Sequence, residues 1–200
     1  RNIPFLRPTF IDFLKGFRYD PAQVKIEQKD GDLDIEIEGP WYQTILFEVP
    51  LMAIICELYF KQYGAVAAIN ESVERATLKA QQIEKLGAKF SEFGTRRRFS
   101  HANQKTVIEI LKKYAPNSLI GTSNLHFAQM YNLLPTGTQA HEFYMAHAAM
   151  YGYPMANRMA LKKWVNVYQG DLGIALTDTY TTDVFLKSFD KFYANLFTGV

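Results

Sequence analysis

Four polar turns, each closing a short apolar run, carry the residue types best suited to chemistry in this chain. They are Phe93-Gly94-Thr95-Arg96-Arg97-Arg98, Gly121-Thr122-Ser123-Asn124, Gly137-Thr138-Gln139-Ala140-His141-Glu142 and Thr177-Asp178-Thr179. Glycine lets a ligand approach the backbone, serine and threonine add hydroxyl groups, and a following helix offers N–H groups to a phosphate or carboxylate. The same residue types also serve in ordinary loops and caps. Four such turns in succession nevertheless favour a site, at the ends of successive strands, that handles a phosphorylated substrate.

His141 is the candidate nucleophile, because it stands in the first turn of an expected helix. The positive end of the helix dipole favours a neutral imidazole there and would stabilise a phosphoryl group carried on the ring. The alternative is a helix-cap or surface histidine. The remaining histidines have no metal-ligand spacing with it, so a zinc site is not expected.

Three further features each allow two interpretations. In the run from Arg96 to Arg98, at least one guanidinium is expected to face inward and grip an anion, although basic triplets are commonly solvated. Asp178 could bind sugar hydroxyls or a magnesium ion, or it could cap the helix expected from Thr182. Phe93 could stack on a flat ring or belong to the core.

The elements that must position these turns fall into two parts. Residues 1–48 are expected to form a small antiparallel unit, with a helix at 10–17, a hairpin of 24–27 and 33–37 around Asp30-Gly31, and a third strand at 41–47. After Pro50 the pattern predicts a buried helix at 51–63 and an amphipathic helix at 66–86. From there strands (89–93, 118–120, 133–134, 173–176, 194–197) alternate with helices (100–115, one from 123, one holding His141, 154–168, 182–189). Residues 49–200 are therefore interpreted as α/β, either an incomplete parallel barrel or an open sheet.

Composition narrows the class of protein. A net charge of +2 gives no reason to expect nucleic acid or an acidic membrane surface as a partner. The single Cys56 lies in an apolar run, where a core position is expected, and it favours a reducing, cytoplasmic compartment. No apolar run is long enough to span a membrane and no signal peptide opens the chain. We expect the chain to be an internal piece of a longer protein.

In order and spacing, these motifs resemble nicotinate phosphoribosyltransferase, most closely its bacterial type. The resemblance covers essentially the whole chain and extends to Gly39-Pro40-Trp41 and Glu48-Val49-Pro50-Leu51. It implies an irregular parallel α/β barrel of the type II phosphoribosyltransferases, preceded by part of an N-terminal α+β domain. It also implies an ATP-dependent enzyme of the ligase class, which joins nicotinate to phosphoribosyl pyrophosphate and forms nicotinate mononucleotide and pyrophosphate in NAD salvage.

The resemblance implies a role for each matching residue. His141 would be the phosphorylated histidine that couples ATP hydrolysis, Phe93 would stack on the pyridine ring, and Arg96 would meet the nicotinate carboxylate or the ribosyl phosphate. Thr138 would line the nicotinate pocket, and Asp178 would address the ribose or its magnesium. ATP and Mg²⁺ are the implied cofactors, with no tightly bound organic cofactor, and a homodimer with shared active sites is implied.

Ser123 bears on the choice of base. The nicotinamide-using relative carries an aspartate at the matching position, which would accept from an amide but repel a carboxylate, whereas a serine hydroxyl can donate to the acid. The nicotinamide enzyme and a non-catalytic barrel that binds phosphorylated metabolites are the alternatives. The family also has a segment before Arg1, with an aromatic residue that covers the pyridine ring of a neighbouring subunit, and phosphate-binding loops after Val200. The 200-residue chain alone is therefore expected to be inactive.

Overall fold

The computed structural model describes Ile3, Leu6–Gly64, residues 66–169 and residues 172–200. The chain divides into two compact units. One is formed by Pro8–Thr136, and the other by Gly137–Val200 with the described residues of Arg1–Arg7. Among the described helices, none is long and apolar enough to cross a membrane.

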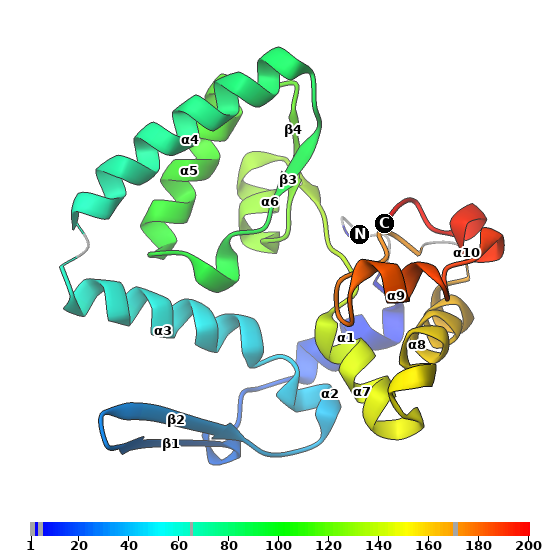
Figure 1. Ribbon diagram of the computed structural model, residues 1–200. Coiled ribbons are helices and arrows are strands. Elements are labelled where there is room, and N and C mark those ends of the chain that lie inside the picture. The colour runs from blue at the N-terminus through cyan, green and yellow to red at the C-terminus, as the bar shows by residue number, and fades with distance from the viewer. Residues whose placement is uncertain (1–2, 4–5, 65, 170–171) are drawn as a thin grey trace. The chain divides into compact units, whose positions relative to one another are not determined.

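The larger unit contains a two-stranded antiparallel sheet, a three-stranded parallel sheet and several helices (Figure 1). Its elements are α1 (Pro8–Gly16), the 3₁₀ turn η1 (Pro21–Gln23), β1 (Val24–Lys29), β2 (Asp32–Ile37), α2 (Trp41–Thr44), α3 (Glu48–Gln62), α4 (Val66–Leu86), β3 (Phe90–Glu92), η2 (Thr95–Arg97), α5 (His101–Tyr114), β4 (Leu119–Thr122), α6 (Leu125–Tyr131) and β5 (Leu134–Pro135).

The predicted hairpin is confirmed. β1 and β2 pair antiparallel, with Val24 opposite Ile37. Asp30 and Gly31 both have positive φ, 51° and 90°, which is the backbone that a two-residue hairpin turn requires and that Asp-Gly adopts readily. Local turn chemistry therefore set this register correctly.

The strand predicted at 41–47 is wrong, because Trp41–Thr44 forms helix α2. Aromatic and branched residues suggested a strand there. The carbonyl of Pro40, however, accepts hydrogen bonds from the backbone N–H groups of Gln43 and Thr44 at 2.9 and 3.1 Å. These local bonds close a helical turn, so the segment leads into α3 rather than extending the hairpin.

Helix α3 forms as predicted but is not buried. Among its residues, all of which are described, Ala53 is the buried one. Met52, Ile54 and Leu58 are exposed, and Cys56, expected in the core, is only partly buried. The apolar residues surround the whole helix, so its sequence could not indicate which side packs against η2 within this unit.

The parallel sheet has the order β3-β4-β5, as expected for strands separated by helices. Helix α4 has the predicted bounds and buries Ala80 in a cluster with Leu111 of α5 and Leu119 of β4. Ser100 caps α5 as predicted, since its Oγ accepts from the backbone N–H of Asn103 at 3.0 Å. This packing fixes the ends of β3 and β4, from which two of the polar turns start.

Within its described residues, the smaller unit contains four helices, α7 (His141–Tyr151), α8 (Tyr153–Tyr168), α9 (Thr182–Leu186) and α10 (Lys191–Leu196) (Figure 1). Its core gathers around Tyr144, Leu161, Leu172 and Phe185. The strand predicted at 173–176 is reduced to parallel bridges from Ile174 to Thr138 and to Gly199.

The strand predicted at 194–197 is also wrong, because these residues mostly lie in α10. Asp190 caps this helix, since its Oδ1 accepts from the N–H groups of Phe192 and Tyr193 at 2.9 and 3.3 Å. The stabilisation of the helix by this cap outweighs the preference of the aromatic residues for a strand. The fold is thus mixed α/β with a small antiparallel sheet followed by a parallel one, while the barrel and the domain boundary at residue 48 stay predictions.

Candidate active site

The six predicted site residues divide between the two units. The larger unit holds Phe93, Arg96 and Ser123, and the smaller holds Thr138, His141 and Asp178. In each unit they follow parallel segments: β3 and β4 in the first, and the bridged residues Thr138 and Ile174 in the second. Polar turns at the ends of parallel segments are the arrangement that the sequence indicated.

Phe93 directly follows β3 and is 49% exposed. The alternative interpretation, a core phenylalanine, therefore does not hold within this unit. An exposed aromatic ring on a turn is available to stack on a flat ligand.

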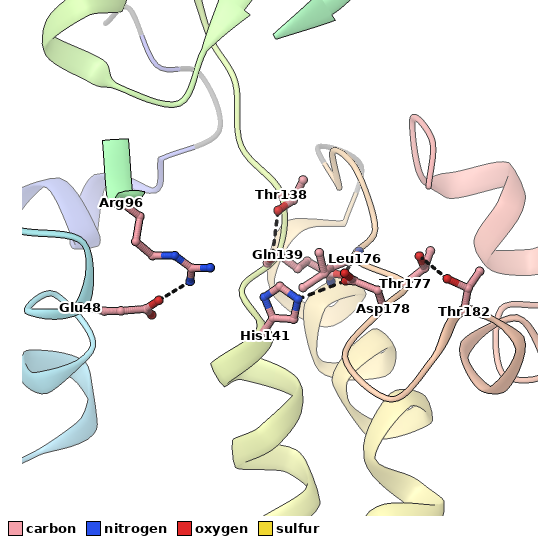
Figure 2. Close-up of polar contacts among 9 residues, drawn as sticks. All are labelled: Glu48, Arg96, Thr138, Gln139, His141, Leu176, Thr177, Asp178 and Thr182. Atoms are coloured by element: carbon pink, nitrogen blue, oxygen red, sulfur yellow. Dashed lines mark hydrogen bonds and ion pairs between the residues drawn. The ribbon is translucent and has the colours of Figure 1, made fainter. Parts of the chain in front are cut away.

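Arg96 lies on η2 and pairs with Glu48, the first residue of α3, with 2.5 Å between Nη1 and Oε1 (Figure 2). Both side chains are partly exposed, at 36% and 39%, so the pair is open to exchange with a ligand carboxylate. Arg98 instead donates from Nη1 to Oε1 of Gln104 at 3.1 Å, and Arg97 is exposed. Glu48 was not predicted as a site residue, although it opens Glu48-Val49-Pro50-Leu51, a segment that carries part of the family resemblance, and it is acidic in the first turn of α3.

Glu92 was also missed. It ends β3, is 9% exposed, and its carboxylate accepts from the backbone N–H of Gly94 at 2.5 Å and from the Thr122 hydroxyl at 2.7 Å. The signal in the sequence was a charged residue at the end of an apolar run, immediately before Phe93. Its carboxylate ties the turn after β3 to the end of β4.

Ser123 follows β4, and its backbone N–H donates to the carbonyl of Glu92 at 2.9 Å. The helix expected to open at Ser123 begins at Leu125 as α6, with Asn124 as the cap that accepts from the N–H of Phe127 at 3.1 Å. Within the described part of the chain, the Ser123 hydroxyl makes no hydrogen bond. It is therefore available to donate to a ligand.

His141 is the first residue of α7, as predicted. The N-cap is Ala140, whose side chain makes no cap hydrogen bond. The positive end of the helix dipole lies beside the imidazole, and it favours an anion there, such as a phosphoryl group carried on the ring.

His141 and Asp178 face one another, with 3.1 Å between Nε2 and Oδ1 (Figure 2). An ionised carboxylate can only accept, so the contact places the ring proton on Nε2 and leaves the lone pair on Nδ1. Asp178 does not cap α9, whose N-cap is Thr181. Its carboxylate thus orients the candidate nucleophile, a contact that no motif in the sequence indicated.

A buried glutamine holds the two segments of this pair together. Gln139 is 2% exposed, and its Oε1 accepts from the hydroxyl of Tyr144 and from the backbone N–H of Leu176 at 3.4 Å. The hydroxyl of Thr138 donates to the carbonyl of Gln139 at 2.9 Å (Figure 2). Burial raises the pKa of the Tyr144 phenol, because loss of water disfavours the phenolate. Tyr144 therefore remains a donor to Gln139.

Among the described residues, no three His, Cys, Asp or Glu side chains lie together so as to hold a metal ion. His147 is buried, with its Nδ1 2.7 Å from the carbonyl of Phe143. Of the four histidines, His141 is the one that pairs with a described carboxylate.

Comparison with known proteins identifies the family. Residues 88–200 match the nicotinate phosphoribosyltransferase (NAPRTase) family, and residues 1–56 match the NAPRTase N-terminal domain. The first match contains all six predicted site residues. The chain belongs to the nicotinate phosphoribosyltransferase family.

Relatives in this family are similar along the whole chain. A nicotinate phosphoribosyltransferase from Chromohalobacter salexigens is 46% identical over 100% of this chain and 52% of its own length. The crystal structure of nicotinate phosphoribosyltransferase from Porphyromonas gingivalis is 47% identical, with a TM-score of 0.91 over 99% of this chain and 51% of that one. The structure of a putative nicotinate phosphoribosyltransferase from Saccharomyces cerevisiae is 36% identical, with a TM-score of 0.86. The chain spans about half the length of the curated relatives it matches.

Proposed function

We propose that this chain is part of a nicotinate phosphoribosyltransferase. The enzyme joins nicotinate to phosphoribosyl pyrophosphate and forms nicotinate mononucleotide and pyrophosphate, and it couples this reaction to ATP hydrolysis through His141. The observation that carries the proposal is the pairing of His141 with Asp178 at the start of α7, in a chain whose curated relatives are named for this activity.

The coupling step follows from the orientation of the imidazole. The Nδ1 lone pair of His141 attacks the γ-phosphorus of ATP, the bond from that phosphorus to the bridging oxygen breaks, and ADP leaves with the electron pair. Asp178 keeps the proton on Nε2 and stabilises the positive charge that develops on the ring. The positive end of the α7 dipole stabilises the negative charge of the phosphoryl oxygens. Later transfer of the phosphoryl group to water gives inorganic phosphate and restores the histidine.

The turns of the larger unit supply the proposed base site. Phe93 offers an exposed face to the pyridine ring, and the Ser123 hydroxyl donates to the nicotinate carboxylate. Arg96 takes part by exchanging Glu48 for a substrate anion, either the nicotinate carboxylate or the ribosyl phosphate. For Thr138, which belongs to the smaller unit, we propose contact with nicotinate. Ser123 favours nicotinate over nicotinamide, because an oxygen donor suits the acid.

The wider assembly is also part of the proposal. We expect the parallel strands to belong to an irregular α/β barrel of the type II phosphoribosyltransferases, and the enzyme to act as a cytoplasmic homodimer with shared active sites. We expect Mg²⁺ to bind together with the phosphates of phosphoribosyl pyrophosphate and ATP. Asp178 can contact this ion or the ribose. Sequence identities of 46% and 45% with relatives named nicotinate phosphoribosyltransferase support this assignment.

The test uses the full-length protein that contains this chain. Mononucleotide and pyrophosphate formation are followed with nicotinate or nicotinamide, with and without ATP, for the unmodified protein, His141→Ala and His126→Ala. His126 is an exposed histidine outside the proposed site, so its variant is the matched control. We expect turnover of nicotinate but not nicotinamide, with stimulation by ATP that only His141→Ala abolishes. No turnover of either base would refute the function, and stimulation that survives His141→Ala would refute the phosphohistidine.

A further inference from the structure

The carboxylate of Glu92 is surrounded by donors from three elements. Oε1 accepts from the N–H of Gly94 at 2.5 Å and from Nε2 of Gln104 at 3.0 Å. Oε2 accepts from the same Gln104 nitrogen at 3.1 Å and from the hydroxyl of Thr122 at 2.7 Å. Gln104 and Thr122 are 3% and 0% exposed. A buried carboxylate is costly unless hydrogen bonds replace its water, and here they do.

The donors of Glu92 are bonded in turn to the two turns of the proposed base site. The Gln104 amide also donates to the Thr95 hydroxyl at 2.8 Å, and Asn124 Nδ2 donates to the same hydroxyl at 3.0 Å. The Thr122 hydroxyl accepts from the N–H of Asn124 at 3.1 Å. Together with Glu92, these residues form one closed network, which we call the Glu92 network (Glu92, Thr95, Gln104, Thr122, Asn124).

Only a group that accepts at both oxygens can set every direction in this network. Because the carboxylate has no proton to give, it fixes the Thr122 hydroxyl and the Gln104 amide as donors. The Thr122 oxygen is then left to accept from Asn124, and the Gln104 oxygen to accept from Arg98 at 3.1 Å. A glutamine at position 92 would turn its NH₂ toward one of these donors and break part of the network.

We propose that Glu92 is a positioning residue for the base site, which holds the turn carrying Phe93 and Arg96 and the turn carrying Ser123 in one fixed geometry. In addition to the network, the backbone carbonyl of Glu92 accepts from the Ser123 N–H at 2.9 Å. Glu92 therefore bonds to both turns and fixes the distance between them. An apolar side chain would fill the same volume at a smaller cost in desolvation. It would leave the donors of Gly94, Gln104 and Thr122 without their acceptor. The two turns would then be free to move independently of each other. This inference rests on the proposed function.

The experiment compares Glu92→Gln with Glu109→Gln in the full-length enzyme. Glu109 is a matched control, because it also accepts a hydrogen bond, from the Tyr131 hydroxyl at 2.7 Å, but lies outside the network. The Michaelis constant for nicotinate, kcat, phosphorylation of His141 by ATP and the melting temperature are measured for each. For Glu92→Gln we expect at least a tenfold rise in the Michaelis constant for nicotinate, kcat within about threefold, and unchanged phosphorylation of His141, which belongs to the other unit. Glu109→Gln should match the unmodified enzyme.

A second variant tests whether the effect travels through the network. Gln104→Met keeps the length of the side chain and removes its donors, and it should raise the same constant. The double variant should be little worse than the poorer single one, because both changes break the same network. A folded Glu92→Gln enzyme with an unchanged Michaelis constant for nicotinate would overturn the proposal, as would additive effects. Failure of both single variants to fold would also overturn it and make the network a folding element. Failure of the unmodified enzyme to use nicotinate would instead refute the proposed function.

Discussion

Gly121 stands where the backbone of β5 lies close to β4, so a single methyl group there should be costly. Gly121 is paired with Leu134 in the parallel register. A Cβ at position 121 would lie 2.6 Å from the Leu134 carbonyl oxygen and still closer to the Thr136 hydroxyl. The hydroxyl can rotate away, but the carbonyl is backbone, so the two strands must move apart.

The expected cost follows from that separation. Overpacking that shifts backbone costs about 1–3 kcal/mol, so Gly121→Ala should lower the free energy of unfolding by about that amount. Because the next residue, Thr122, donates to Glu92, the strained strand should also displace the Ser123 turn and raise the Michaelis constant for nicotinate.

The assay is urea unfolding of the full-length protein, followed by circular dichroism, with Gly16→Ala as the control. A Cβ at Gly16 meets nothing within 4 Å, and the residue ends α1. We expect that variant to be as stable as the unmodified protein or slightly more stable, because alanine is the better helix former. Equal stability of the two variants would show that the strands do not approach as closely as described, and the reasoning would fail.

Two further predictions concern the smaller unit. Asp178→Asn should slow phosphorylation of His141 by at least about tenfold, because the neutral amide no longer fixes the proton on Nε2. The rate is measured as acid-labile phosphate formed on the protein. An unchanged rate would contradict the role of Asp178. Burial raises the pKa of the Tyr144 phenol above its ordinary value of 10.0. Above pH 10.0 the unfolded chain therefore releases a proton that the folded chain keeps. The free energy of unfolding must then fall as pH rises. Tyr144→Phe removes this component, so its stability should fall less steeply between pH 9 and pH 11 in urea unfolding, and equal slopes would count against the buried phenol.

The sequence predicted those elements whose signals are local. Asp30-Gly31 set the hairpin, Ser100 marked the start of α5, and helical periodicity gave the bounds of α4. The start of α7 at His141 was likewise readable, because a polar Gly-Thr turn precedes a continuous helical run. Such signals act within a few residues of backbone and need no partner from elsewhere in the chain.

The errors occurred where local signals compete. Residues 41–47 and 194–197 are rich in aromatic residues, which favour strands. Hydrogen bonds to the Pro40 carbonyl and to the Asp190 side chain nevertheless close helical turns. The prediction that α3 is buried was wrong for another reason. Its apolar residues surround the helix, and the packing of the unit decides which side is covered.

For the site, the sequence determined which residue types stand at the ends of parallel segments, and tertiary structure decided their partners. Asp178 lies 37 residues from His141, Thr122 lies 30 from Glu92, and Glu48 lies 48 from Arg96. A hydrogen bond requires two atoms within about 3 Å of each other, and over such separations no periodicity or cap motif fixes a distance. The candidate nucleophile could therefore be named from its place at the start of a helix. Two carboxylates were decided only when the chain folded: the one that pairs with His141, and the one that bonds to both turns of the proposed base site.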